Sequence, residues 1–97
     1  MKPILTLVLA AVLSVPVMAD TYTGVVSDVK HFRNGGLAVD LDGHYPAEKM
    51  ALYVPPSAAA GIGALPTKGN KVTATGTIGS YRGRPEIKIW KPDQWKW

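Results

Sequence analysis

Apolar and polar residues alternate along residues 70–90, and the alternation predicts two β-strands joined by a turn. Side chains in a strand point to opposite faces with period two, so every second residue shares a face. The predicted inward positions are Val72, Ala74, Gly76, Ile78, Ile87 and Ile89. Between the strands, Gly83 permits a positive φ, which favours a tight turn. The predicted hairpin therefore displays Tyr81, Arg82 and Arg84 at its tip.

Earlier in the chain, the same alternation in residues 37–42 and 50–54 predicts two more strands. Residues 21–30 are rich in Val and Thr, but their apolar positions do not alternate strictly, which predicts a first strand with a bulge or bend. A bent first strand can pair with neighbours in two sheets. Ser57 is expected to cap a short helical segment through residues 58–60.

The predicted order is therefore three strands, a short helix and two further strands. This order fits an all-β, five-stranded Greek-key barrel, the OB-fold, with the short helix between strands 3 and 4. Closing the sheet into a barrel would also remove the exposed strand edges that a small protein must otherwise protect. An SH3-like barrel is the alternative, although it normally has no helical segment before its fourth strand.

The first 19 residues have the three parts of a secretory signal peptide. A positive Lys2 precedes an apolar run from Ile4 to Val17, and small residues end the segment at Ala19. The apolar run is shorter than the roughly 20 residues that span a bilayer. We expect a signal peptide at 1–19 and one domain at 20–97. The protein would be periplasmic or secreted, with no stable membrane insertion after cleavage.

Composition narrows the class of protein further. Residues 20–97 carry ten Lys and Arg against seven Asp and Glu, a formal charge of +3. A mildly basic surface favours an anionic partner without specifying one. The chain has no cysteine, which excludes disulfides, a cysteine-ligated zinc site and a cysteine-linked lipid anchor. Stability must then come from close packing of the sheet.

The last 30 or so residues resemble a known family. Residues 69–78 follow the pattern G-x-x-V-x-V-x-G-x-I with Ala74 in place of the second Val, and residues 81–89 follow Y-x-G-x-P-Q-I-x-V with Glu86 in place of Gln and Ile89 in place of Val. A D-P-x-Q-I ending is matched in part by residues 91–95, with Trp95 in place of Ile. These motifs resemble the nucleic-acid-binding OB-fold domains of the anticodon-binding and helicase type. Together with the predicted signal peptide, the resemblance implies an exported bacterial version of such a domain.

In that family, the ligand lies on the face of the second and third strands, between the loops after the first strand and before the fifth. The resemblance places these loops at 30–36 and 80–85. Both combine rings with cationic side chains, which suits a single-stranded nucleic acid because rings stack on bases and cations neutralise phosphates. The expected ligand-binding residues are Lys30, His31, Phe32, Arg33, Tyr53, Tyr81, Arg82, Arg84 and Lys88. The alternative is that Phe32 and Tyr81 cover the barrel ends.

Two acidic residues complicate this prediction. Asp40 and Asp42 fall on the outward positions of the second strand, where they would repel a phosphate backbone. With His44 they also make a D-x-D-x-H spacing that could hold a metal ion. The more ordinary interpretation is a solvated strand face, so no metal site and no cofactor is expected.

Residues for catalysis are few. The chain has no cysteine, and neither its serines nor His31 and His44 stand in a recognisable nucleophile pattern. We therefore expect a non-enzymatic protein that binds single-stranded nucleic acid or a similar extended anionic ligand. The alternative function is a periplasmic adaptor for an envelope protein, a peptide or an oligosaccharide. Trp90, Trp95 and Trp97 are expected to cover the barrel rather than bind a ligand.

Overall fold

The part of the chain that the structure describes is mostly β-structure with one short α-helix. In this computed structural model, residues 19–97 are described, and the predicted signal peptide lies almost wholly outside them. The elements are β1 (Asp20–His31), β2 (Leu37–Leu41), β3 (Met50–Val54), α2 (Pro56–Ile62), β4 (Lys71–Gly76), β5 (Ile78–Tyr81), β6 (Arg84–Lys88), the 3-10 helix η1 (Pro92–Gln94) and β7 (Trp95–Lys96). Within residues 19–97, no helix has the length and apolar character to cross a membrane.

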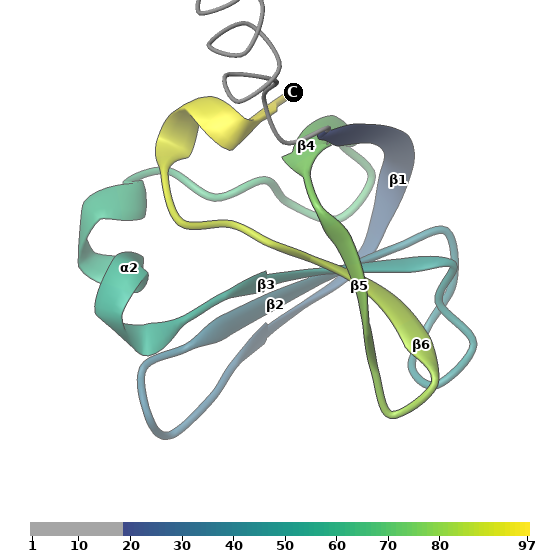
Figure 1. The fold of residues 1–97 in the computed structure, drawn as a ribbon, viewed down its shortest axis with the longest axis horizontal. Coiled ribbons are helices and arrows are strands. Elements are labelled where there is room, and N and C mark those ends of the chain that lie inside the picture. Colours follow the sequence, from purple (N-terminus) through teal and green to yellow (C-terminus); the bar gives the residue numbers. More distant parts are fainter. Residues whose placement is uncertain (1–18) are drawn as a thin grey trace, which may run out of the picture.

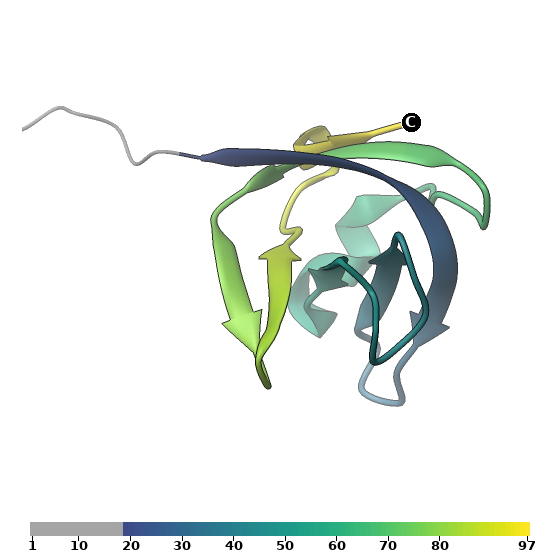
Figure 2. The ribbon, with the colours of Figure 1, turned by 90° about the vertical axis from the view of Figure 1, so that its right-hand side faces the viewer.

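Strand β1 is long and bent, as the irregular spacing of its apolar residues predicted. Its first half, from Asp20 to Val25, pairs with β4, and its second half, from Val26 to His31, pairs with β2. The register shifts between Val26 and Asp28, which marks a β-bulge. One strand therefore belongs to both halves of the sheet (Figure 2).

The strands form one sheet in the order β5-β6-β3-β2-β1-β4-β7. Strands β3 and β6 run parallel, and the other neighbouring strands are antiparallel. The sheet curls into a half-barrel, with α2 beyond the end of β3 (Figures 1 and 2). This curl brings the β5–β6 turn and the β1–β2 turn to the same end of the molecule (Figure 1).

The core fills the inside of the curl with the residues that alternation placed inward. Leu41, Leu52, Val72, Ile87 and Ile89 are fully buried, although they come from four different strands and the segment after β6. Helix α2 adds Ile62 to the same cluster. The inward positions of residues 37–41, 50–54 and 87–89 are thus confirmed.

The strand predicted through residues 70–78 is divided in two. Strand β4 ends at Gly76, and β5 begins at Ile78 and pairs with β6 instead of β1. Ile78 is in register with the buried Ile87 and so keeps the predicted inward side of the sheet, but it is 40% exposed because β5 is an edge strand. Because the C-terminal tail also pairs with β4 as β7, the sheet has seven strands where the pattern predicted five.

Two smaller predictions also need correction. Helix α2 begins at Pro56 after Pro55 and has no side-chain cap, so Ser57 is not its N-cap. The tryptophans have different environments, since Trp95 is 5% exposed whereas Trp90 and Trp97 are 51% and 48% exposed. Only Trp95 covers the core as predicted.

Candidate functional site

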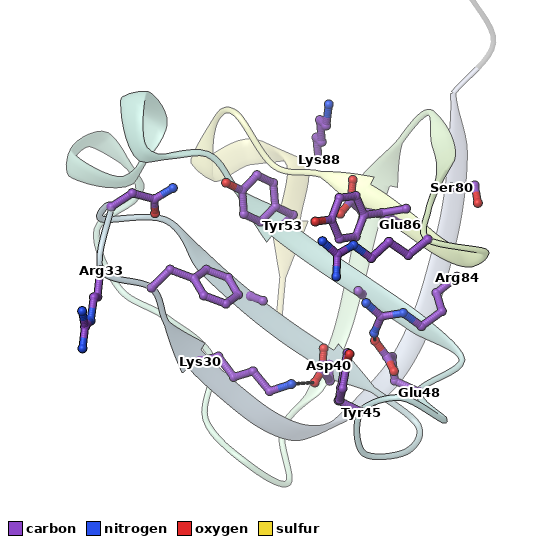
Figure 3. Close-up of a pocket in the computed structure, with 16 residues that line it drawn as sticks. Lys30, Arg33, Asp40, Tyr45, Glu48, Tyr53, Ser80, Arg84, Glu86 and Lys88 are labelled. Atoms are coloured by element: carbon purple, nitrogen blue, oxygen red, sulfur yellow. Dashed lines mark hydrogen bonds and ion pairs between the residues drawn. The ribbon is translucent and has the colours of Figure 1, made fainter.

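A groove of about 850 Å³ lies on the outer face of β2, β3 and β6, between the β1–β2 and β5–β6 turns. Figure 3 shows it with the residues that line it. They are Lys30, Phe32, Arg33, Asn34, Ala38, Asp40, Tyr45, Glu48, Ala51, Tyr53, Ser80, Tyr81, Arg82, Arg84, Glu86 and Lys88. This cavity is called the groove below.

The β1–β2 turn is held by hydrogen bonds within its own backbone. The amide of Phe32 donates to the carbonyl of Gly36 over 2.9 Å, and the amide of Gly35 donates to the carbonyl of Phe32 over 3.0 Å. The Asn34 side chain accepts a further bond from the amide of Gly36. The aromatic and cationic residues of this loop are therefore presented by a defined turn.

The β5–β6 turn is a two-residue hairpin. Tyr81 pairs with Arg84, and the two residues between them, Arg82 and Gly83, have φ of 51° and 78°. Positive φ at both central positions is the type I′ geometry that matches the twist of the strands. Gly83 adopts it readily, whereas Arg82 does so at some cost. The turn places Tyr81 and Arg82 on the rim of the groove.

The structure gathers eight of the nine expected ligand-binding residues around the groove. His31 is the exception. Lys30 and Phe32 line the groove, and His31, between them, does not. Since neighbouring side chains in an extended segment point to opposite sides, His31 faces away and is exposed.

The aromatic residues of the groove are accessible. Phe32 and Tyr81 are 43% and 51% exposed, so they do not cover the ends of the sheet. The Phe32 ring lies 6.3 Å from the Tyr53 ring, centroid to centroid, with the planes tilted by 51°. Tyr53 comes from the middle of β3, as predicted from its outward position. The groove therefore offers ring faces from a loop, a strand and a hairpin.

Two buried carboxylates lie beneath this surface. Asp40 is 2% exposed, and Glu48, from the loop between β2 and β3, is 5% exposed. Lys30 Nζ lies 3.2 Å from Asp40 Oδ2, and Arg84 binds Glu48 Oε2 over 2.5 Å. The expectation that Asp40 is solvated is therefore wrong, because the groove residues cover it. A buried carboxylate is stable only with such partners.

Tyr45 joins the two ion pairs. The charged groups of Lys30 and Arg84 each lie 4.4 Å from the centre of its ring, within the range of a cation–π interaction. Figure 3 shows Tyr45 and Glu48 close to Asp40 and Arg84. Lys30 and Arg84 thus already have partners. The cationic side chains of the groove without an ion-pair partner among residues 19–97 are Arg33, Arg82 and Lys88.

The burial of Asp40 affects its protonation. Removal from water raises the pKa of the carboxyl, and the nearby Lys30 opposes this shift. Within residues 19–97, Glu48 Oε1 has no hydrogen-bond partner, and Asp40 Oδ2 has only its ion pair. The two carboxylates at the floor of the groove are therefore paired with cations but incompletely hydrogen-bonded.

Asp42 has a different environment and takes no part in the groove. It has a φ of 57°, and its carboxylate accepts bonds from the Tyr22 hydroxyl over 2.6 Å and from the Val25 amide over 2.9 Å. Both bonds lower the pKa of Asp42. The bond to Asp42, together with burial, raises the pKa of Tyr22 to about 12. Asp40, Asp42 and His44 are not brought together, and residues 19–97 contain no group of three or more potential metal ligands.

Sequence reasoning missed Tyr45 and Glu48. Both belong to the segment between β2 and β3, where no hydrophobic period assigns a side to each residue. One signal in the sequence could have pointed to this segment. Asp40 lies between two apolar residues of a strand, and a carboxylate that a loop covers there needs a cationic partner.

Comparison with known proteins does not assign the chain to a family. No model of a protein family matches it, and no curated protein matches it significantly. Its chemistry must therefore be argued from the groove. Accessible rings can stack on flat groups, and accessible guanidinium and ammonium groups can bind anionic oxygens.

Proposed function

We propose that the sheet is an OB-type barrel in which β4 and β5 form one bent strand. Three observations support this. Strand β1 pairs with both β2 and β4, β3 and β6 run parallel, and only Thr77 separates β4 from β5. With β4 and β5 counted as one strand, the order of neighbouring strands closes on itself. It runs from β1 through β2, β3 and β6 to the β5–β4 strand, which pairs with β1 again. The short β7 is then an addition at one end.

On this barrel, the groove binds single-stranded nucleic acid. The observation that carries the proposal is that the rings of Phe32, Tyr53 and Tyr81 line the same cavity as three cations that have no ion-pair partner among residues 19–97. Bases stack on aromatic faces whatever their sequence, and cations at the edges neutralise the phosphates between them. Arg33 and Lys88 extend from opposite sides of the groove, with their charged ends directed away from its centre (Figure 3).

The charge of the groove suits a weakly bound anion. Five Lys and Arg line it against three Asp and Glu. Lys30 and Arg84 neutralise Asp40 and Glu48. The positive electrostatic potential of the groove therefore comes mainly from the cations of its rim, Arg33, Arg82 and Lys88. We infer that a strand passes over the rings with its phosphates toward the rim, which keeps them away from the buried carboxylates.

Binding of a fluorescent oligothymidylate of about 12 nucleotides to the purified protein tests this proposal. We expect binding at low salt that weakens steeply as salt increases, because phosphate contacts release counterions. Arg82→Ala should weaken binding several-fold and reduce the salt dependence by about one ion. Arg84 is a poor choice for this test, because its removal leaves Glu48 buried without a partner.

Lys68→Ala is the matched control. Lys68 is exposed in the turn before β4 and does not line the groove, so the substitution removes the same charge at another place. Equal effects of the two substitutions would mean that only net charge matters. If the protein does not bind the oligonucleotide at low salt, the nucleic-acid proposal is wrong, and the adaptor function for a protein, peptide or oligosaccharide becomes the better hypothesis.

A further inference from the structure

A second hollow of about 430 Å³ lies next to the groove. It is lined by Thr77, Gly79, Ser80, Glu86, Lys88, Trp90 and Gln94. Ser80, Glu86 and Lys88 line both cavities. The second hollow is therefore a continuation of the groove across β6 toward Trp90.

The outward residues of β6 and the residues after it connect the two cavities. Ile87 and Ile89 are buried in the core, so Glu86, Lys88 and Trp90 share the outer face. Lys88 is in register with Tyr53 of β3, and successive outward residues on an extended chain are about 7 Å apart. Lys88 therefore lies beside Tyr53 on the neighbouring strand and one outward position before Trp90 on its own chain.

The backbone at Trp90 is fixed by Gln94. The Gln94 side-chain oxygen accepts bonds from the amides of Trp90, over 2.7 Å, and Lys91, over 3.1 Å. Its amide nitrogen donates to the carbonyls of Thr75 and Lys88, over 3.1 Å and 3.0 Å. Since the chain is held on both sides, the exposed Trp90 side chain is presented from a rigid position.

We infer that Trp90 is a second stacking position, on which the single strand continues after it leaves the groove past Lys88. This inference rests on the proposed nucleic-acid binding. A large ring that is 51% exposed beside a cation and a hollow suits an unpaired base. Trp97 is 48% exposed but lines neither cavity, and its ring packs edge-on against Trp95 at 5.7 Å.

Oligonucleotides of two lengths test the inference. An oligothymidylate of about 4 nucleotides fits within the groove, whereas one of about 12 extends beyond it. We expect Trp90→Ala to weaken binding of the 12-mer about tenfold and of the 4-mer less than twofold. Trp90→Phe keeps a ring and should retain most of the affinity. Trp97→Ala is the matched control and should bind both as the wild type does.

A spectroscopic measurement separates direct contact from an indirect effect. The indole N–H signal of Trp90, assigned from its loss in Trp90→Phe, should shift on addition of the 12-mer and stay in place with the 4-mer. Equal binding of the 12-mer by wild type and Trp90→Ala would overturn the inference while leaving the proposed function intact. Failure of the wild-type protein to bind either length would instead overturn both.

Discussion

At the residue scale, the environment of each charge decides what it can do. Lys30 and Arg84 belong to the groove by position, yet each pairs with a buried carboxylate and lies against Tyr45. Leaving a buried charge unpaired costs more than the pair contributes. These two cations are therefore held in place by the fold, and the cations of the rim remain available for a ligand.

Asp42 gives a prediction about pH. Its pKa is lowered below the ordinary 3.8 by the bonds from Tyr22 and Val25. The ionised carboxylate of Asp42 therefore stabilises the folded state fully above the ordinary pKa of 3.8. This stabilisation is lost as pH falls through the lowered pKa of the folded state. We expect Asp42→Asn to reduce the free energy of unfolding at pH 6 by about 1 kcal/mol, at the low end for charge-assisted bonds because Asp42 is partly exposed.

Urea unfolding of wild type and Asp42→Asn across pH 6 to pH 2.5 measures this effect. The difference between the two proteins should shrink below about pH 4. Asn tolerates the positive φ of this position, so backbone strain does not confound the comparison. A difference that stays constant over the whole range would show that the carboxylate charge plays no part.

The face of each strand residue could be predicted from the sequence, but its exposure could not. Period two placed Asp40 and Tyr53 correctly on the outer face of the sheet. Alternation carries no information about what lies over that face. The segment between β2 and β3 contributes Tyr45 and Glu48 to the same face, and this turned a predicted solvated carboxylate into a buried one.

At the element scale, the break between β4 and β5 decides how the sheet curls. Gly76 ends β4 where the chain leaves β1 and approaches β6. A Cβ at this position would lie 2.8 Å from Ile87 Cγ2 and 3.2 Å from Gln94 Nε2. No other residue type can therefore pack here without moving a core side chain or the Gln94 contact.

We expect Gly76→Ala to destabilise the protein by about 1–3 kcal/mol, the usual cost of overpacking a core contact. Gly79→Ala is the matched control in β5, because its Cβ would meet only Glu86 O at 3.9 Å. Thermal unfolding followed by circular dichroism should show a lower midpoint for Gly76→Ala alone. Equal midpoints for the two variants would mean that the chain between β4 and β5 accommodates the added methyl group without cost.

The hairpins and the bulge in β1 could be predicted from local sequence, whereas the strand break could not. A turn is specified by the few residues that form it, such as Arg82 and Gly83. The alternation from Val72 to Ile78 is unbroken in the sequence. Ile78 keeps its predicted side, opposite the buried Ile87, but its strand pairs with β6 instead of β1, and a change of partner is a property of the whole sheet.

At the scale of the whole molecule, the two turns and the β3 surface combine into one site. Their residues are separated by up to 58 positions, from Lys30 to Lys88, and meet only because the sheet curls (Figures 1 and 3). The sequence predicted this meeting through a resemblance to a family rather than from local pattern. The placement around one groove agrees with that expectation, while its ligand stays a prediction.

Export is also a prediction about the whole chain. If residues 1–19 are a signal peptide, the mature protein begins at Asp20, the first residue of β1. Intact-mass measurement on protein expressed from the full sequence in a bacterium should give the mass of residues 20–97, and the protein should be released with the periplasm. Ala19→Arg should block cleavage. An intact mass that includes Met1 in the wild type would contradict the assignment.

The two-sided pairing of β1 also has a consequence for unfolding. Any motion that detaches its first half from β4 pulls on the same backbone that holds β2, on the far side of the bulge. Because both halves of the sheet pair with this one strand, opening either half weakens the support of the other. The domain should therefore melt as one cooperative unit, with its slowest amide exchange along the centre of β1.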